Sequence, residues 1–192
     1  MTLHPPEVYK LNTYELPRRA GEMKEYALDI AAPEKVGIEL IAVPAGEIIQ
    51  LDARLESVAE GILLSAEIYA VATGECTRCL DPLEIVIEKR IQELYLYEQK
   101  TDRRKGAAPV EDFEGVDEFL MDGDTMDLEG PIRDAIVLSL PSNPLCSNTC
   151  EGLCSYCGGK WSELPTDHAH EVIDARWAAL SNLEVDSPDF KN

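Results

Sequence analysis

Cysteine and histidine are concentrated in a few short stretches of this 192-residue chain. Four of the six cysteines fall within twelve residues, separated by three, three and two residues, and two of the three histidines follow shortly after. Two more cysteines form a Cys-x-x-Cys pair far upstream. Thiolate and imidazole are the ligands that a tetrahedral zinc ion takes, and a Cys-x-x-Cys pair can bind it from one tight turn. The candidate metal ligands are Cys76, Cys79, Cys146, Cys150, Cys154, Cys157, His168 and His170.

These eight ligands can be grouped in two ways. In the first, the four clustered cysteines hold one ion, and Cys76 and Cys79 stay free. In the second, there are two ions: the upstream pair joins Cys146 and Cys150, and the last two cysteines join the two histidines. We favour the second because it makes two closed sets of four, the coordination of structural zinc. It predicts that Cys79 lies close to Cys146 despite 66 intervening residues.

The parts of this pattern differ in specificity. Gly158 follows Cys157 and can take a positive φ, which lets its N–H close a metal-binding turn. The Cys76/Cys79 spacing also suits a redox dithiol. The rival interpretation is therefore a redox-switched regulatory zinc protein that uses this pair, and thiol alkylation with and without chelator separates the two. No general base is placed beside the ligands and no phosphate-binding glycine loop is present, so we expect a protein that is not an enzyme.

Composition limits the partners. Hydrophobic residues make up 45% of the chain, which predicts a folded protein, and 17 Lys+Arg against 37 Asp+Glu give a net charge of −20. A protein with this negative net charge repels phosphate groups and favours basic partners. The N-terminus lacks the basic start and apolar run of a signal peptide, and no apolar run is long enough to span a bilayer. We expect a cytoplasmic protein whose cysteines are reduced.

The order of elements predicts an α+β fold. Apolar and polar residues alternate over much of residues 1–99, which predicts an antiparallel β-sheet or open barrel with the Cys-x-x-Cys pair at a hairpin tip. Residues 100–126 are predicted to form a flexible connector that is first basic and then acidic. Residues 127–192 are expected to form a helix that ends at Pro141, a zinc-binding module, and a C-terminal helix beginning at Asp174, packed on the sheet.

Several longer motifs resemble the bacterial YceD family, in the actinobacterial branch. They are Gly74–Pro82, Asp127-Leu128, Leu138–Pro141, Pro144–Cys146, Cys150–Gly158 and Asp174–Leu180, and the likeness runs from about Leu11 to Leu180. Many family members carry Cys-x-Cys where this chain has His168-Ala-His170, a change that keeps two potential ligands.

The resemblance implies a role in the accumulation of large-subunit (23S) ribosomal RNA. Family genes commonly lie beside the gene of a small basic zinc-ribbon protein of the large subunit, and plant relatives act in organelle rRNA maturation. The implied partners are a ribosomal protein of the large subunit, an rRNA precursor, or both. The tentative partner-binding residues are Arg78, Arg103, Arg104, Lys105, Asp117, Glu118, Asp122 and Asp124.

Overall fold

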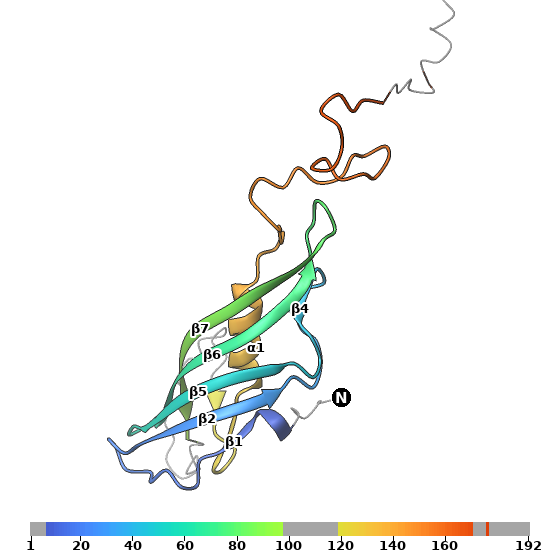
Figure 1. Cartoon of the computed structure of the whole chain (residues 1–192). Coiled ribbons are helices and arrows are strands. Elements are labelled where there is room, and N and C mark those ends of the chain that lie inside the picture. The colour runs from blue at the N-terminus through green and yellow to red at the C-terminus, as the bar shows by residue number, and fades with distance from the viewer. Residues whose placement is uncertain (1–6, 98–118, 171–175, 177–192) are drawn as a thin grey trace, which may run out of the picture. The chain divides into compact units, whose positions relative to one another are not determined.

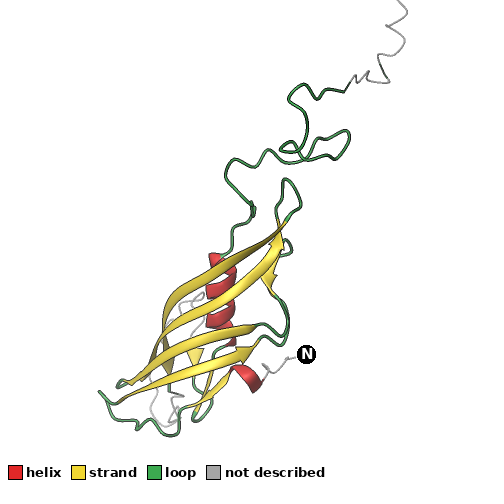
Figure 2. Cartoon of the chain, in the orientation of Figure 1, coloured by secondary structure: helices red, strands yellow, loops and turns green. Residues whose placement is uncertain are grey.

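The computed structural model describes residues 7–97, 119–170 and 176. Within them, the chain forms a β-sheet with an α-helix on one of its faces (Figures 1 and 2). The elements, in chain order, are a 3-10 turn Glu7–Tyr9, β1 Lys10–Asn12, β2 Met23–Ala31, β3 Val36–Gly37, β4 Ile41–Val43, β5 Ile48–Ser57, β6 Gly61–Glu75, β7 Pro82–Leu96, β8 Phe119–Leu120, β9 Thr125–Asp127 and α1 Glu129–Ser139.

The main sheet is built around β6. One edge of β6 pairs with β7 along its whole length, from Gly61 opposite Leu96 to Glu75 opposite Pro82. The other edge pairs first with β5 and then with β4, while β2 extends the sheet beyond β5 (Figure 1). All these pairings are antiparallel; β8 adds a short parallel pairing at the end of β7. The predicted α+β fold with an antiparallel sheet in the N-terminal half is confirmed.

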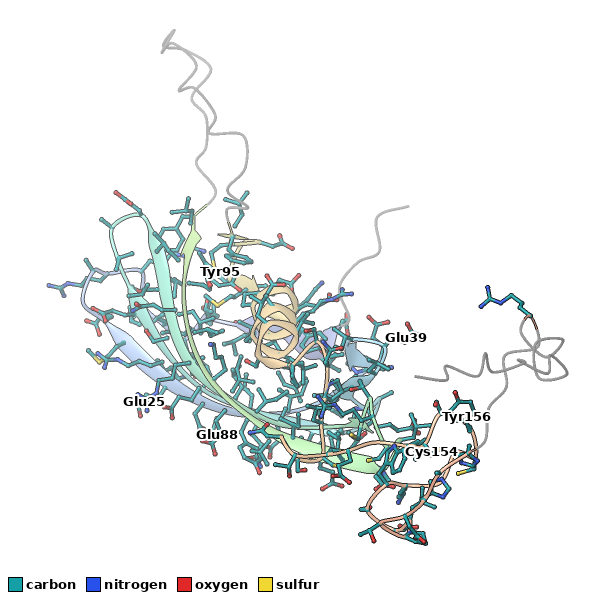
Figure 3. All side chains as sticks on the ribbon, turned by 90° about the horizontal axis from the view of Figure 1, so that it is seen from above. Glu25, Glu39, Glu88, Tyr95, Cys154 and Tyr156 are labelled. Atoms are coloured by element: carbon teal, nitrogen blue, oxygen red, sulfur yellow. The ribbon has the colours of Figure 1, made fainter. Side chains whose placement is uncertain are left out.

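Alternation along the strands decides which face of the sheet is buried. From Ile49 to Leu55, every second residue of β5 is buried and the residues between them are exposed. The period of two places the buried set on one face. That face packs against α1, whereas Glu25 and Glu88 project from the opposite face (Figure 3).

The helix follows the sequence pattern closely. Ile132 and Ile136 are buried and lie one turn apart, so they share the side of α1 that joins the core. Pro131 sits in the first turn, where a missing N–H removes no helical hydrogen bond. The helix ends before Leu140 because Pro141 disfavours the helical conformation there; Leu140 is extended, with ψ of 137°.

The segment before α1 is fixed by pairing with distant strands. Of the predicted connector (residues 100–126), residues 100–118 lie outside the described residues, whereas residues 119–126 contain β8 and the first two residues of β9. β9 pairs with β1, which places Met126 opposite Leu11 in the core. The ring of Phe119 lies 5.2 Å from that of Tyr95, whose hydroxyl donates to the carbonyl of Asp127. Buried apolar side chains therefore order residues 119–127.

The chain divides into two compact units, Met1–Cys150 and Glu151–Asn192. The domain limits of the sequence analysis stay a prediction, and the expected C-terminal helix lies outside the described residues except for Arg176. In the described part of the chain, no helix has the length and apolar character needed to cross a membrane.

Candidate metal centres

The hairpin of β6 and β7 ends in a tight loop that carries Cys76 and Cys79. The Cys76 N–H donates to the Asp81 carbonyl at 2.8 Å, and the Leu80 N–H donates to the Cys76 carbonyl at 2.9 Å. Leu80 closes the loop in the left-handed region, with φ of 61°. A loop of this kind, which we call the first knuckle (residues 76–81), is a ligand turn ready to present two sulfurs to one ion.

The segment after α1 brings a second pair of cysteines, Cys146 and Cys150, to the first knuckle. The Thr77 N–H donates to the carbonyl of the buried Pro144 at 2.9 Å, and the Thr77 hydroxyl donates to the same oxygen at 3.2 Å. The Arg78 guanidinium donates to the Cys150 carbonyl at 2.7 Å. Backbone and side-chain hydrogen bonds thus hold two distant segments together.

The four sulfurs of this first set form a compact cluster. Cys76 Sγ lies 3.9 Å from Cys150 Sγ, and Cys79 Sγ lies 3.6 Å from Cys146 Sγ. All four ligand atoms lie within 4.8 Å of one another. Zinc–sulfur bonds of about 2.3 Å place the sulfurs of a tetrahedral site about 3.8 Å apart. The observed spacing fits that geometry, and the cysteines are free thiols that form no disulfide.

The surroundings of the first set favour a thiolate at Cys76. Backbone N–H groups of Cys146, Cys79 and Arg78 point at its sulfur and lower the pKa of Cys76 to about 6. The Asp81 N–H acts in the same sense on Cys79, but burial and the neighbouring sulfurs outweigh it and raise the pKa of Cys79 to about 12. Four sulfurs this close share negative charge poorly, which is the condition that a bound cation relieves.

A second knuckle, residues 154–159, repeats the hydrogen bonds of the first. The Cys154 N–H donates to the Gly159 carbonyl and the Gly158 N–H donates to the Cys154 carbonyl, both at 2.8 Å. Gly158 takes φ of 71° at the position where the first knuckle has Leu80. Two separate stretches of sequence therefore form the same ligand turn.

The second knuckle meets two histidines. Cys157 Sγ lies 3.5 Å from His168 Nε2, and the ligand atoms of Cys154, Cys157, His168 and His170 lie within 4.8 Å of one another. Backbone N–H groups of Cys157 and Tyr156 lower the pKa of Cys154 to about 6. Cys154 is buried, whereas Cys157 and His170 are exposed, so this set lies nearer to solvent than the first.

The grouping of ligand atoms matches the two-ion partition rather than the one-ion partition. Each set supplies four Cys or His atoms, the number that a tetrahedral structural site takes. Such sites hold chain segments together. The identity of the metal and the role of each ligand stay predictions.

The tentative partner-binding residues have varied surroundings. Arg78 donates a hydrogen bond to the Cys150 carbonyl. Asp124 accepts a hydrogen bond of 2.6 Å from Arg18, which also donates to the Gly123 carbonyl at 2.7 Å. Asp122 is exposed beside this turn. The residues of this group that lie outside the described ones are Arg103, Arg104, Lys105, Asp117 and Glu118.

Two structural features of the sites were not predicted from the sequence. Leu80 holds a backbone conformation that normally favours glycine. Tyr156 and Trp161 place their rings against the paired histidines. The sequence signal for the second feature is the position of these aromatic residues, one inside the Cys-x-x-Cys turn and one just after it.

The chain is thus an α+β protein in which a largely antiparallel sheet is backed by one helix. It carries two sets of four Cys/His ligands, each built on a knuckle. Within the α+β class the assignment is specific. The chain belongs to the YceD family, because residues 64–184 match the family described as large ribosomal RNA subunit accumulation protein YceD.

The chain is also similar to mycobacterial proteins. An uncharacterized protein of Mycobacterium tuberculosis is 41% identical over 170 residues, which are 88% of this chain and 77% of the relative. An uncharacterized protein of Mycobacterium leprae is 33% identical over 168 residues, which are 88% of this chain and 74% of the relative. No solved structure matches the chain.

Proposed function

We propose that the protein is a cytoplasmic, zinc-stabilised ribosome-assembly factor that supports synthesis, processing or stability of 23S rRNA. The observation that carries this proposal is membership of a family named for accumulation of the large ribosomal RNA subunit. The family is named for that process rather than for a reaction, and four ligands in each set are what a structural zinc ion would take. The protein acts by binding.

Zinc in the two sets would be structural. Cys76, Cys79, Cys146 and Cys150 would hold one ion; the last two cysteines and the paired histidines would hold the other. A metal in these sets would supply cross-links in place of disulfides, which do not persist in a reducing cytoplasm. The first cross-link would join the β6–β7 hairpin to a segment 67 residues further along the chain.

The charge favours a protein partner over direct contact with RNA. A net charge of −20 opposes binding along a phosphate backbone, where contacts depend on Lys and Arg. Arg78, one of the tentative partner-binding residues, already donates to the Cys150 carbonyl, and the nearby charge of Asp124 is paired with Arg18. We propose that the chain holds a basic ribosomal protein of the large subunit during assembly.

The process is tested by replacing the gene in cells with a variant that loses two of the four ligands of the first set, Cys79→Ser with Cys146→Ser. We expect less large-subunit rRNA relative to small-subunit rRNA, measured by gradient sedimentation and by quantifying both RNAs. Arg19→Ala, an exposed change away from the ligands, is the control. A full deletion with a normal ratio of the two RNAs would overturn the proposed function.

The partner is tested by purifying the tagged chain from growing cells at low and high salt. We expect a basic large-subunit protein to co-purify at low salt and to dissociate at high salt, since steering fields decay over about 8–10 Å at physiological ionic strength. Recovery of rRNA without ribosomal protein would refute the protein-partner mechanism while leaving the role in rRNA accumulation standing.

A further inference from the structure

Four aromatic rings form an unbroken row across the second ligand set. The ring centroids of Tyr156 and His170 are 5.4 Å apart, and those of His170 and His168 are 4.5 Å apart with planes at 87°. The Trp161 ring meets His168 edge-on, at 5.5 Å and 77°. All three spacings lie in the range of favourable aromatic contacts. The two histidines therefore stand between two larger rings.

Among the described residues, the two histidines are placed by few contacts besides these rings and the sulfurs of their own set. They lie in an irregular segment outside any helix or strand, where the His168 N–H donates to the Pro165 carbonyl at 3.0 Å. The first ligand set, by contrast, is held by a β-hairpin and by Arg78. An imidazole binds a metal only when a ring nitrogen points at it, so a ligand histidine needs a neighbour that fixes its ring.

Both flanking rings are themselves fixed. Tyr156 lies inside the second knuckle, in the same loop as Cys154 (Figure 3), and its N–H points at the Cys154 sulfur. The Trp161 N–H donates to the Gly152 carbonyl at 3.0 Å, just beyond the bridge that pairs Leu153 with Lys160. Each ring thus extends from backbone that the cysteine half of the set already orders.

We infer that Tyr156 and Trp161 are positioning residues that orient the histidine half of the second set toward a metal ion. Tyr156 packs against His170 on one side of the set, and Trp161 packs against His168 on the other, so each histidine ring is held by a ring on ordered backbone. This inference rests on the proposed function, because it assumes that the second set takes zinc.

The histidines offer a direct readout, because two of the three in the chain belong to the second set and none belongs to the first. In the full chain labelled with ¹⁵N-histidine, metal binding moves the nitrogen resonance of each ligand ring. A chelator titration followed by these resonances gives the zinc affinity of the second set alone.

We expect Trp161→Ala and Tyr156→Ala to lower the zinc affinity of the second set by about tenfold, the lower end of the loss seen when ligand-orienting neighbours are removed. Trp161→Phe and Tyr156→Phe keep a ring and should stay within about threefold of the parent, well inside that loss. At saturating zinc, the alanine variants should show averaged histidine nitrogen resonances while the sheet amides keep their parent positions. Tyr14→Ala, at an exposed tyrosine of the first unit, is the matched control.

Three outcomes overturn the inference. Alanine variants with parental affinity, or phenylalanine variants as weak as the alanine ones, would show that the rings do not orient the histidines. Loss of the sheet amide resonances in the alanine variants would show that the rings support the fold as a whole, which is a structural role and not a positioning one. A different result would refute the zinc binding assumed in the proposed function. If zinc leaves the histidine resonances of the parent chain unmoved, the second set does not bind zinc.

Discussion

Leu80 is in an unusual place for a leucine, at the left-handed position that closes the first knuckle. A side chain there costs about 1–2 kcal/mol because its Cβ approaches the following carbonyl oxygen. Leu80→Gly removes that cost but adds about 0.5–1 kcal/mol of chain freedom in the unfolded state. Since Leu80 is 59% exposed, little packing is lost.

We therefore expect Leu80→Gly to leave the free energy of unfolding of the zinc-loaded chain within about 1 kcal/mol of the parent. Leu80→Val should lower it by more than about 1 kcal/mol, because β-branched residues tolerate positive φ least. Urea unfolding at fixed zinc measures both changes. A large loss in the glycine variant would mean that the Leu80 side chain makes a contact essential to the fold.

Arg78 ties the first knuckle to the second cysteine pair through the Cys150 carbonyl. Its removal breaks a hydrogen bond from a charged donor, and since the pair is exposed to water we expect Arg78→Ala to lower the stability of the zinc-loaded chain by about 1 kcal/mol. Thermal unfolding with and without zinc measures the effect, which should shrink when the metal is removed. Arg19→Ala is the control; an equal loss in that variant would show a general charge effect.

At the scale of elements, Tyr95 connects β7 to the segment that precedes α1. Burial, followed by the negative charges of Asp127 and Glu93, raises the pKa of Tyr95 above its ordinary value of 10.0. The neutral hydroxyl is thus favoured in the folded state. Its stabilising contribution is present below pH 10 and declines as pH rises above that, when the unfolded chain ionises and the folded chain does not.

Tyr95→Phe should lower the free energy of unfolding by about 1 kcal/mol near neutral pH, because the Asp127 carbonyl loses its donor. Above about pH 10 the gap between parent and variant should close. Denaturant unfolding at a series of pH values checks this, with Tyr14→Phe, at an exposed hydroxyl, as the control. A gap that widens with pH would contradict the assigned direction.

The elements that could be predicted from sequence are those with enough residues to show a period. β2 and β5 alternate over nine and ten residues, and α1 has its buried residues at helical spacing and a proline at its end. β8 and β9 have only two and three residues, and distant partners define them, so no local pattern marks them. Likewise, residue types indicated the ligand sets, whereas the contacts of Tyr156 and Trp161 with the histidines depend on how an irregular segment folds back.

For the whole molecule, the net charge of −20 should control how strongly the chain binds a basic partner. We expect Asp117→Asn, Glu118→Gln and Asp122→Asn together to weaken the complex with a basic ribosomal protein and to reduce its salt dependence, while zinc content stays at about two ions. Asp124 is left intact because it pairs with Arg18. Isothermal titration at two salt concentrations measures the change.

The same variant separates protein from RNA as the partner. If rRNA is the direct ligand, removing three acids should strengthen its binding, and Arg103→Ala with Arg104→Ala should weaken it. Unchanged affinity for the basic protein would show that this acidic segment is simply solvated.

The first ligand set has a consequence for the order of events during synthesis. Cys79 leaves the ribosome 67 residues before Cys146, an interval of roughly 3–13 s at 5–20 residues per second. Over that time the β6–β7 hairpin can form, because its pairing is local, yet its ligand set is only half made. Each newly made chain thus exposes an open dithiol to whatever metals and oxidants the cell contains. If the first set takes zinc, an ion can be held by all four sulfurs only once Cys150 has left the ribosome.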